Sequence, residues 1–257
     1  MSTSNTPAGK RPGTDRSVLD DPGLFGRLWA EDYDGPGNPD PTDAVDFLAE
    51  RARGGPVLEL AVGTGRVALP LAARGLTVEG VEASPEMVAK LRAKPGGDRI
   101  RVAIGDMADV PVDGPYRLAY LVFNTLFNLV RAERQQDCFR NVARVLAPGG
   151  EFVIETFVPD PADFDRNEQV QMRSVTEDSA TIRLHQYDRA AQTFVRQLIT
   201  FDAEGVHLKP FAMRYAWPEQ IDEMAAAAGL RLVDRYADWH RRPFEATSPS
   251  HISVYRR

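Results

Sequence analysis

The amino-acid sequence predicts an α/β fold, in which helices cover both faces of a parallel sheet and an antiparallel β insertion follows that sheet. Three observations support this prediction. Short apolar runs alternate with helical segments between residues 56 and 157. A two-residue alternation of apolar and polar side chains replaces that rhythm over residues 168–215. A helix and two further apolar runs then close the chain.

The N-terminal 17 residues are rich in Ser, Thr, Pro and Gly and contain almost no large apolar side chain. Such a segment cannot bury enough surface to offset the entropy of ordering it. We therefore predict a flexible tail over residues 1–17 and a single folded domain over residues 18–257. Two short helices are expected to begin that domain, because Asp21 and Asp40 each precede a proline, a pattern typical of helix starts.

The alternating segment predicts five buried strands, which we place at 57–61, 76–81, 100–104, 116–123 and 151–157. Helices are expected between them, over 66–73, from Ser84 onward and over 131–147. The last of these helices has one apolar face, and the single cysteine of the chain, Cys138, is expected to pack in the core on that face. A glycine-rich turn is expected before the fifth strand, at 147–150.

Residues 168–215 predict an insertion of four antiparallel strands, around 170–175, 180–185, 193–201 and 206–213. Its alternating apolar faces suit two uses. The insertion is expected either to cover the active site or to pair with a second subunit in a homodimer. A helix is expected from Pro218, followed by strands at 230–236 and 252–255.

The turn after the first strand carries the strongest functional signal. Gly63 and Gly65 lie between a strand and a helix, where glycine lets the backbone approach a ligand beside the N-terminus of the helix. Glu82 ends the next strand, where a carboxylate can accept hydrogen bonds from both hydroxyl groups of a ribose. The pattern therefore predicts a ligand that contains a nucleoside.

Two such ligands fit the turn. Residues 63–68 match the G-x-G-x-x-A form of the dinucleotide fingerprint, which would make the protein an NAD(P)-dependent oxidoreductase. Glu59 opposes that reading, because a carboxylate in the last turn of the strand would repel a pyrophosphate and attract a cation. S-adenosyl-L-methionine (SAM) has an ammonium, a sulfonium and a ribose but no phosphate. The electrostatics favour SAM, and the oxidoreductase stays as the alternative.

Three segments resemble the first sequence motifs of class I SAM-dependent methyltransferases: VLELAVGTG at 57–65, GVEASPEMV at 80–88 and IGDM at 104–107. The segment at 141–157 resembles the helix and fifth strand of that family, and the resemblance extends over roughly residues 25–257. It implies a Rossmann-like seven-stranded sheet with five parallel strands and a C-terminal strand pair, of which the last strand is antiparallel. Ala61 stands where the family usually has glycine, and it is accommodated if its φ is negative.

The resemblance also assigns residues to the cofactor. The turn from Glu59 to Gly65 would hold the methionine moiety, Glu82 the ribose hydroxyl groups and Asp106 the adenine amino group. The region of Tyr33 would fold over the pocket as a lid. Met87 and Met107 fit core packing equally well. The full expected set is Tyr33, Glu59, Ala61, Gly63, Gly65, Glu82, Ala83, Met87, Asp106, Met107, Phe123 and Asn124.

The resemblance places the methyl acceptor beyond the carboxyl ends of the strands, at the rim formed by the insertion and the loop at 238–250. A general base is needed only if the attacking atom keeps its proton, as a hydroxyl does. The expected catalytic residues are His240, His251 and Tyr215. The expected acceptor-binding residues are Phe127, His185, Arg214 and Trp217.

Composition restricts the partners. The 257 residues carry a net charge of −6 without a block of Lys and Arg, which disfavours nucleic acid. We find no metal-ligand spacing and no apolar run long enough to span a bilayer, and a lone cysteine indicates a reducing, cytoplasmic setting. What remains is a SAM-dependent enzyme that methylates an O, N or C atom of a small molecule, such as a secondary metabolite, and releases S-adenosyl-L-homocysteine. A non-catalytic SAM-binding module and a SAM enzyme that transfers another group stay as alternatives.

Overall fold

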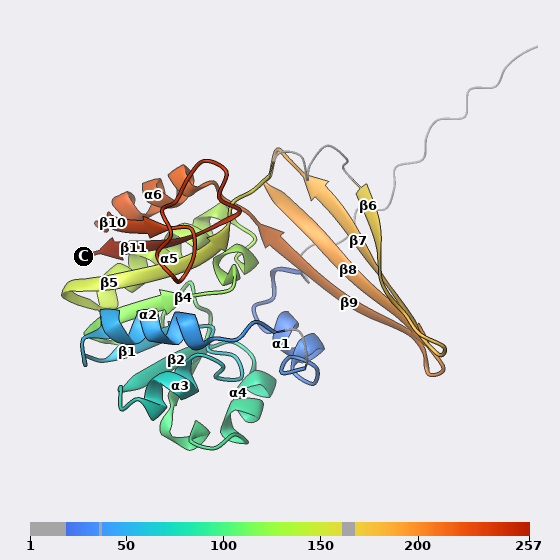
Figure 1. Cartoon of the computed structure of the whole chain (residues 1–257), viewed down its shortest axis with the longest axis horizontal. Helices are drawn as coiled ribbons and strands as arrows, with labels where there is room; N and C mark the ends of the chain where they lie inside the picture. The colour runs from blue at the N-terminus through green and yellow to red at the C-terminus, as the bar shows by residue number, and fades with distance from the viewer. Residues whose placement is uncertain (1–18, 36–37, 161–167) are drawn as a thin grey trace, which may run out of the picture.

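The computed structural model describes residues 19–35, 38–160 and 168–257, which form two β-sheets with helices around the larger one (Figure 1). The tail predicted over residues 1–17 lies outside the described residues. The larger sheet has seven strands and the smaller has four. The predicted α/β class with an antiparallel insertion is confirmed.

The seven-stranded sheet has the order β10-β11-β5-β4-β1-β2-β3. Neighbouring strands from β5 to β3 are parallel, whereas β11 is antiparallel to both β5 and β10. This is the predicted arrangement of five parallel strands and a C-terminal pair. The strands are β1 (Val57–Leu60), β2 (Val78–Glu82), β3 (Arg101–Ile104), β4 (Tyr116–Leu121), β5 (Leu146–Phe157), β10 (Arg231–Tyr236) and β11 (Ser250–Arg256).

The strand order reverses between β1 and β4, because the chain runs outward from β1 to β3 and then crosses back to the other side of β1. In an open parallel sheet, the crevice at such a reversal opens at the carboxyl ends of the strands and is the usual ligand site. All four residues of β1 are buried, as expected for a strand covered on both faces. The fold therefore directs the loops after β1, β2, β3 and β4 to one rim.

The helices that flank the sheet are α2 (Thr42–Ala52), α3 (Ala68–Ala73), α4 (Pro85–Arg92), α5 (Ala132–Val145) and α6 (Pro218–Ala227). One buried cluster joins the sheet to α2, α3 and α4 through Phe47, Leu71 and Leu91. A second cluster joins the opposite face to α5 and α6 through Cys138 and Ile221, so the cysteine packs in the core as predicted. No helix in the part of the chain that the structure describes is long and apolar enough to cross a membrane.

Among the boundaries that differ from the sequence prediction are the starts of α3 and β5. α3 begins at Ala68 rather than at residue 66, because the turn after β1 continues through Arg66. β5 begins at Leu146 and includes the predicted turn at 147–150. Gly149 has φ +71° there, and the register between β4 and β5 shifts at the same place, so the start of the strand is irregular rather than a separate turn.

The smaller sheet, here called the arm, is antiparallel and has its strands in sequence order (Figure 1). It projects from the seven-stranded sheet, and the chain enters it after β5 and leaves it before α6. Its four strands match the four predicted for the insertion. They are β6 (Glu168–Val175), β7 (Ala180–Asp188), β8 (Thr193–Asp202) and β9 (Gly205–Arg214).

Alternate side chains of the arm point to two faces. The inner face meets α1 (Leu24–Trp29), where the Phe211 ring centroid lies 6.2 Å from that of Trp29 and Lys209 pairs with Asp32. The outer face is apolar and open to solvent. Five of its side chains are each more than half exposed: Val170, Met172, Val175, Val206 and Leu208.

Candidate functional site

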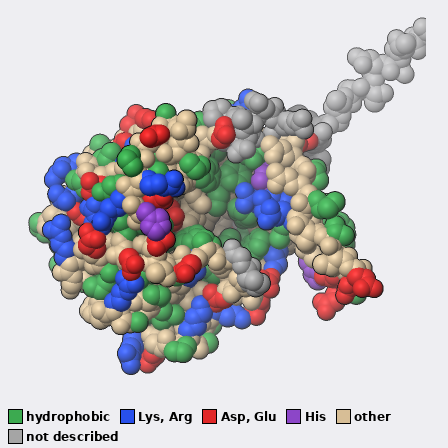
Figure 2. All heavy atoms as spheres, in the orientation of Figure 1, with side chains coloured by type: hydrophobic (Ala, Val, Ile, Leu, Met, Phe, Trp, Pro, Cys, Tyr) green, Lys and Arg blue, Asp and Glu red, His purple; other side chains and the backbone are tan. Residues whose placement is uncertain are grey.

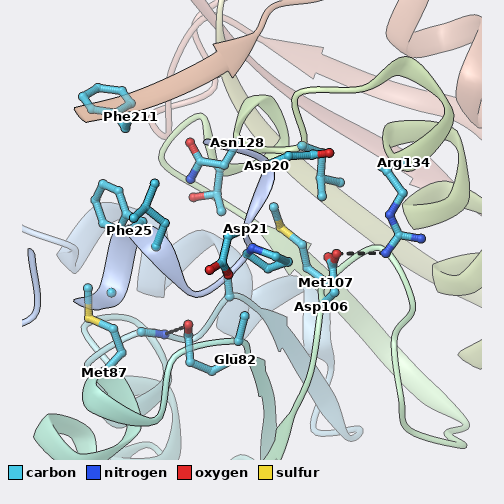
Figure 3. Close-up of a pocket in the computed structure, with 18 of the residues that line it drawn as sticks. Asp20, Asp21, Phe25, Glu82, Met87, Asp106, Met107, Asn128, Arg134 and Phe211 are labelled. Atoms are coloured by element: carbon cyan, nitrogen blue, oxygen red, sulfur yellow. Dashed lines mark hydrogen bonds and ion pairs between the residues drawn. The ribbon is translucent and has the colours of Figure 1, made fainter. Parts of the chain in front are cut away.

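A cavity of about 320 Å³ opens at the carboxyl ends of the parallel strands. The turns after β1, β2, β3 and β4 form its floor, and α1 and the end of β9 form its walls. Figure 3 shows aromatic side chains of α1 and β9 on one side and a carboxylate paired with an arginine on the other. The charged residues that line the cavity are Asp20, Asp21, Glu82, Asp106, Arg131 and Arg134.

The turn between β1 and α3 has left-handed backbone at the cavity. Gly63 has φ +56°, and a Cβ atom there would lie 4.0 Å from the Tyr33 ring. Ala61 has φ +52°, which corrects the expectation of a negative φ at this position. A left-handed alanine costs about 1–2 kcal/mol. Strain of this kind tends to gather at functional sites, where the surrounding structure enforces it.

Glu82 connects the end of β2 to this turn. Its Oε2 accepts a hydrogen bond from the N–H of Gly63 at 2.9 Å, and its Oε1 accepts one from the N–H of Ser84 at 2.9 Å. Burial raises the pKa of the Glu82 carboxyl in spite of these donors. The carboxylate thus lines the cavity in an orientation set by two backbone groups (Figure 3).

Glu59 lies behind the turn and does not line the cavity. It is 5% exposed, and the Tyr120 hydroxyl donates a hydrogen bond to its Oε2 at 2.7 Å. Burial raises the pKa of Glu59 to about 8, so the carboxyl is mostly protonated at pH 7. The charge that favoured a cationic ligand on sequence grounds is therefore small, and Glu59 supports the turn from beneath.

The part of the cavity beyond β3 combines a carboxylate with apolar side chains. Asp106 accepts hydrogen bonds from the guanidinium of Arg134 and from the N–H of Ala108, each at 2.8 Å. Met87 and Met107 line the same space (Figure 3). An apolar slot beside a carboxylate suits a purine with an amino group, and Glu82 beside the glycine turn suits a ribose. These two carboxylates and the apolar side chains beside them fit SAM. The described residues contain no group of His, Cys, Asp and Glu that could hold a metal ion.

The turn after β4 also has strained backbone. Phe123 and Asn124 have φ of +62° and +60°, and two consecutive left-handed residues other than glycine are unusual. Glu155 on β5 stabilises them, because its Oε2 accepts from the N–H of Phe123 at 2.9 Å and its carbonyl from that of Asn124 at 3.1 Å. The guanidinium carbon of Arg66 lies 3.1 Å from the centroid of the Phe123 ring. Phe123 is thereby held at the cavity wall.

The segment from α1 to Asp34 covers the cavity. Gly26 packs directly on α4, since a Cβ atom there would lie 2.1 Å from the Ser84 hydroxyl. Asp34 accepts a hydrogen bond from the Thr64 hydroxyl at 2.7 Å and pairs with Lys94 at 2.8 Å. These contacts fix both ends of the segment, and Tyr33 lies between them on the cavity wall.

The structure brings together nine of the twelve residues expected at the cofactor. Glu59, Gly65 and Asn124 lie outside the lining. The carboxamide oxygen of Asn124 accepts from the N–H of Phe157, which directs that side chain to β5. The nine that line the cavity are Tyr33, Ala61, Gly63, Glu82, Ala83, Met87, Asp106, Met107 and Phe123.

The three residues expected to be catalytic do not line the cavity. His240 is exposed, and its Nε2 lies 3.1 Å from a carboxylate oxygen of Asp43. His251 is fully buried, hydrogen-bonded to Thr156 at 2.9 Å, and burial lowers its pKa to about 3. Tyr215 is buried after the end of β9. No residue of the loop at 238–250 lines the cavity either.

The four residues expected to bind the acceptor also lie outside the lining. Phe127 is buried against Phe157, with ring centroids 4.8 Å apart. Arg214 donates to the side chain of Gln135 at 2.7 Å. Trp217 lies at the start of α6. His185 lies on β7, on the inner face of the arm and outside the cavity lining.

Sequence reasoning missed most of the residues that α1 and β9 contribute. Phe25 on α1 and Phe211 on β9 both line the cavity, and their ring centroids lie 6.3 Å apart. A signal for α1 exists, because Phe25, Trp29 and Tyr33 recur every four residues and so form one aromatic stripe. No local signal marks Phe211, which reaches the cavity only because the arm folds back over α1.

The comparisons with known proteins agree with this geometry. Residues 57–150 match the model of a family described as a methyltransferase domain. The solved structure of the CcbJ methyltransferase from Streptomyces caelestis is 38% identical, with a TM-score of 0.85 over 92% of this chain and 98% of that one. This chain therefore belongs to the class I SAM-dependent methyltransferases. It is an enzyme whose methyl donor is SAM, which answers the oxidoreductase alternative.

Two further relatives are informative. The cypemycin N-terminal methyltransferase of a Streptomyces species is 28% identical over 205 residues, which cover 78% of this chain and 82% of that protein. The SAM-bound structure of CalS10, an amino pentose methyltransferase from Micromonospora echinaspora, has a TM-score of 0.66 and is 23% identical over 90% of this chain and 96% of that one. Because CalS10 is only 23% identical to this chain, the likeness to it shows a shared fold alone.

We expect the contribution of Glu59 to the stability of the protein to fall as the pH rises from about 4.5 to about 8, because the folded state holds the Glu59 proton more tightly than the unfolded state. Glu59→Gln should remove this contribution, which is on the order of a few kcal/mol. Urea unfolding at several pH values measures it. Glu79→Gln, on the neighbouring strand, is the control and should keep the wild-type profile. Equal pH profiles for Glu59→Gln and the wild type would contradict the expectation.

Glu82→Ala should weaken binding of S-adenosyl-L-homocysteine by about 10- to 100-fold, the loss expected for a hydrogen bond to a charged group. Isothermal titration calorimetry gives the dissociation constant. Glu86→Gln alters an exposed carboxylate four residues further along the chain and should bind as the wild type does. An unchanged constant for Glu82→Ala would exclude Glu82 from the cofactor site.

Proposed function

We propose that this enzyme transfers a methyl group from SAM to an amine nitrogen of a small molecule, of the kind found among secondary metabolites. The supporting observation is the charge of the cavity. Four carboxylates and two guanidinium groups line it, with Asp20, Asp21 and Asp106 each paired with an arginine, and the described lining includes no histidine. An acidic cavity without a strong base attracts an amine, whose lone pair forms without help from the protein once a proton is lost to water.

The residues of the chain hold and align the reactants. SAM supplies a methyl group on a sulfonium; the amine lone pair forms the N–C bond as the C–S bond breaks, and the product ammonium then releases a proton to water. Glu82 would hold the ribose, and Asp106 with Met87 and Met107 would hold the adenine. Phe123 and Tyr33 would confine the transferred methyl group. Alignment of this kind is the main source of rate in such a displacement.

One relative supports an amine acceptor. The cypemycin enzyme is named an N-terminal methyltransferase, and an N-terminus is an amine. An oxygen acceptor would need a base, and the expected bases His240 and His251 lie away from the cavity. Buried His251 also has a pKa lowered to about 3 by burial. We therefore propose that neither histidine takes part. Because the chain carries a net charge of −6, we also propose that no nucleic acid is bound.

The test incubates the purified protein with SAM and matched amines and alcohols. Mass spectrometry should find products heavier by one CH₂ group for amines alone. As the pH is lowered, kcat/KM should decline near the pKa of the acceptor amine, because protonation removes the lone pair. A less basic amine therefore shifts this decline to lower pH. His240→Gln should leave that profile unchanged. A profile that does not move with the amine, or methylated alcohols alone, would contradict an amine acceptor.

We also propose that residues 18–257 form one domain, in which the arm at 168–215 covers the active site with its inner face and pairs with a second copy through its outer face. Support comes from the apolar outer face, since soluble monomers rarely leave such a patch open. The lone, buried Cys138 is consistent with a cytoplasmic setting.

Analytical ultracentrifugation tests the pairing. We expect a species of twice the 28.5 kDa chain mass. Leu208→Lys should convert it to a monomer, because a lysine there would be buried at the interface without a partner. Leu232→Lys on β10 places the same charge at another exposed leucine and should leave the dimer intact. A wild-type monomer would contradict the proposal.

A further inference from the structure

The inner face of the arm and its edge carry three arginines that have no carboxylate partner among the residues that the structure describes. Arg183 on β7 and Arg196 on β8 share this face, and Arg173 lies at the register shift of β6 beside them. None of the three forms an ion pair or a hydrogen bond with a carboxylate of residues 19–35, 38–160 and 168–257. Lys209 on this face pairs with Asp32, and the His207 ring lies 3.1 Å from a carboxylate oxygen of Asp202.

Arg196 is held in a defined position. Its Nε donates to Nε2 of His185 at 2.9 Å, and Nδ1 of His185 lies 2.9 Å from the Tyr187 hydroxyl. His185 is buried, and its pKa is lowered to about 4 by burial and by the neighbouring arginines, so the ring is a neutral acceptor at pH 7. The guanidinium carbon also lies 4.9 Å from the Phe211 ring centroid. These contacts use Nε and the faces of the group and leave its two terminal nitrogens as donors.

The arginines also oppose one another. Burial, together with Arg183 and Arg173, lowers the pKa of Arg196 to about 10. The Nε of Arg183 is buried and has no hydrogen-bond partner. Half-buried guanidinium groups without a counter-charge are costly. An anion between them would supply the missing charge and the missing acceptor.

The position of this cluster connects it to the cavity. Phe211 lines the cavity and also lies against Arg196. Figure 2 shows Lys and Arg side chains gathered in the hollow between the seven-stranded sheet and the arm, with hydrophobic side chains behind them. A molecule that reaches from the cavity past Phe211 therefore meets the arginines.

We propose that Arg183 and Arg196, with Arg173 at the edge, form a subsite for an oxyanion group of the methyl acceptor, a carboxylate or a phosphate. Guanidinium groups bind both through paired N–H donors. The proposal rests on the small-molecule function above and adds that the acceptor carries an amine at one end and an acid at the other. The acidic cavity would take the amine, and the arginine cluster would take the acid.

The test measures anion binding and needs no methyl transfer. The full-length protein is first saturated with S-adenosyl-L-homocysteine, so that the cofactor site is filled. It is then titrated by calorimetry, at constant ionic strength, with pyrophosphate in one series and with succinate in another. The stronger of the two identifies the subsite as one for phosphate or for carboxylate.

We expect saturable binding of at least one anion, weakened about tenfold or more by Arg183→Gln and by Arg196→Gln, as for the loss of a charge-assisted hydrogen bond. Arg189→Gln, at an exposed arginine in the turn between β7 and β8, is the matched control and should bind as the wild type does. The two cluster variants should still bind S-adenosyl-L-homocysteine, which reports that they are folded.

Absence of saturable binding, or equal weakening by Arg189→Gln, would overturn the proposal. Either result leaves the methyltransferase function standing, because that function is read from cofactor binding and product mass. Failure to bind S-adenosyl-L-homocysteine would instead count against the proposed cofactor site and would not bear on the arginine cluster. The two proposals therefore fail by different measurements.

Discussion

The hydrogen bond from the N–H of Gly63 to the Glu82 carboxylate joins the two strand ends that make the site. It requires β1 and β2 to be parallel neighbours, so that both carboxyl ends reach the same rim. The N–H belongs to a turn whose backbone is left-handed at Ala61 and at Gly63. The parallel sheet and the strained turn thus support each other, and the cavity exists because both are present.

The site is built in layers around this contact. Glu59 and Glu155 lie behind the two turns, where Glu59 accepts a hydrogen bond from Tyr120 and Glu155 stabilises the strained backbone at Phe123, while Glu82 and Asp106 line the cavity itself. The buried carboxyls have raised pKa values because burial disfavours their charge. Acidic residues that look alike in the sequence thus take two positions, behind the turns or facing the cavity.

The arm adds a second electrostatic character to the same hollow. The cavity is acidic, whereas the inner face of the arm presents arginines without carboxylate partners among the described residues. Phe211 lies at the junction of the two regions, with α1 on one side and Arg196 on the other. An acceptor with separated positive and negative groups matches this division better than an uncharged one.

The sequence by itself determined the α/β class, the glycine turn and Glu82, because these depend on local periodicity and on spacing along adjacent elements, and the family resemblance added Asp106. The sequence could not locate the residues that bind the methyl acceptor. His240, His251 and Phe127 are plausible by residue type, yet pairing with Asp43, burial beside Thr156 and packing on Phe157 remove them from the cavity. Phe25 and Phe211, 186 positions apart, meet there only through the docking of the arm on α1. Contacts between distant segments depend on how whole elements pack, and only the tertiary structure decides that.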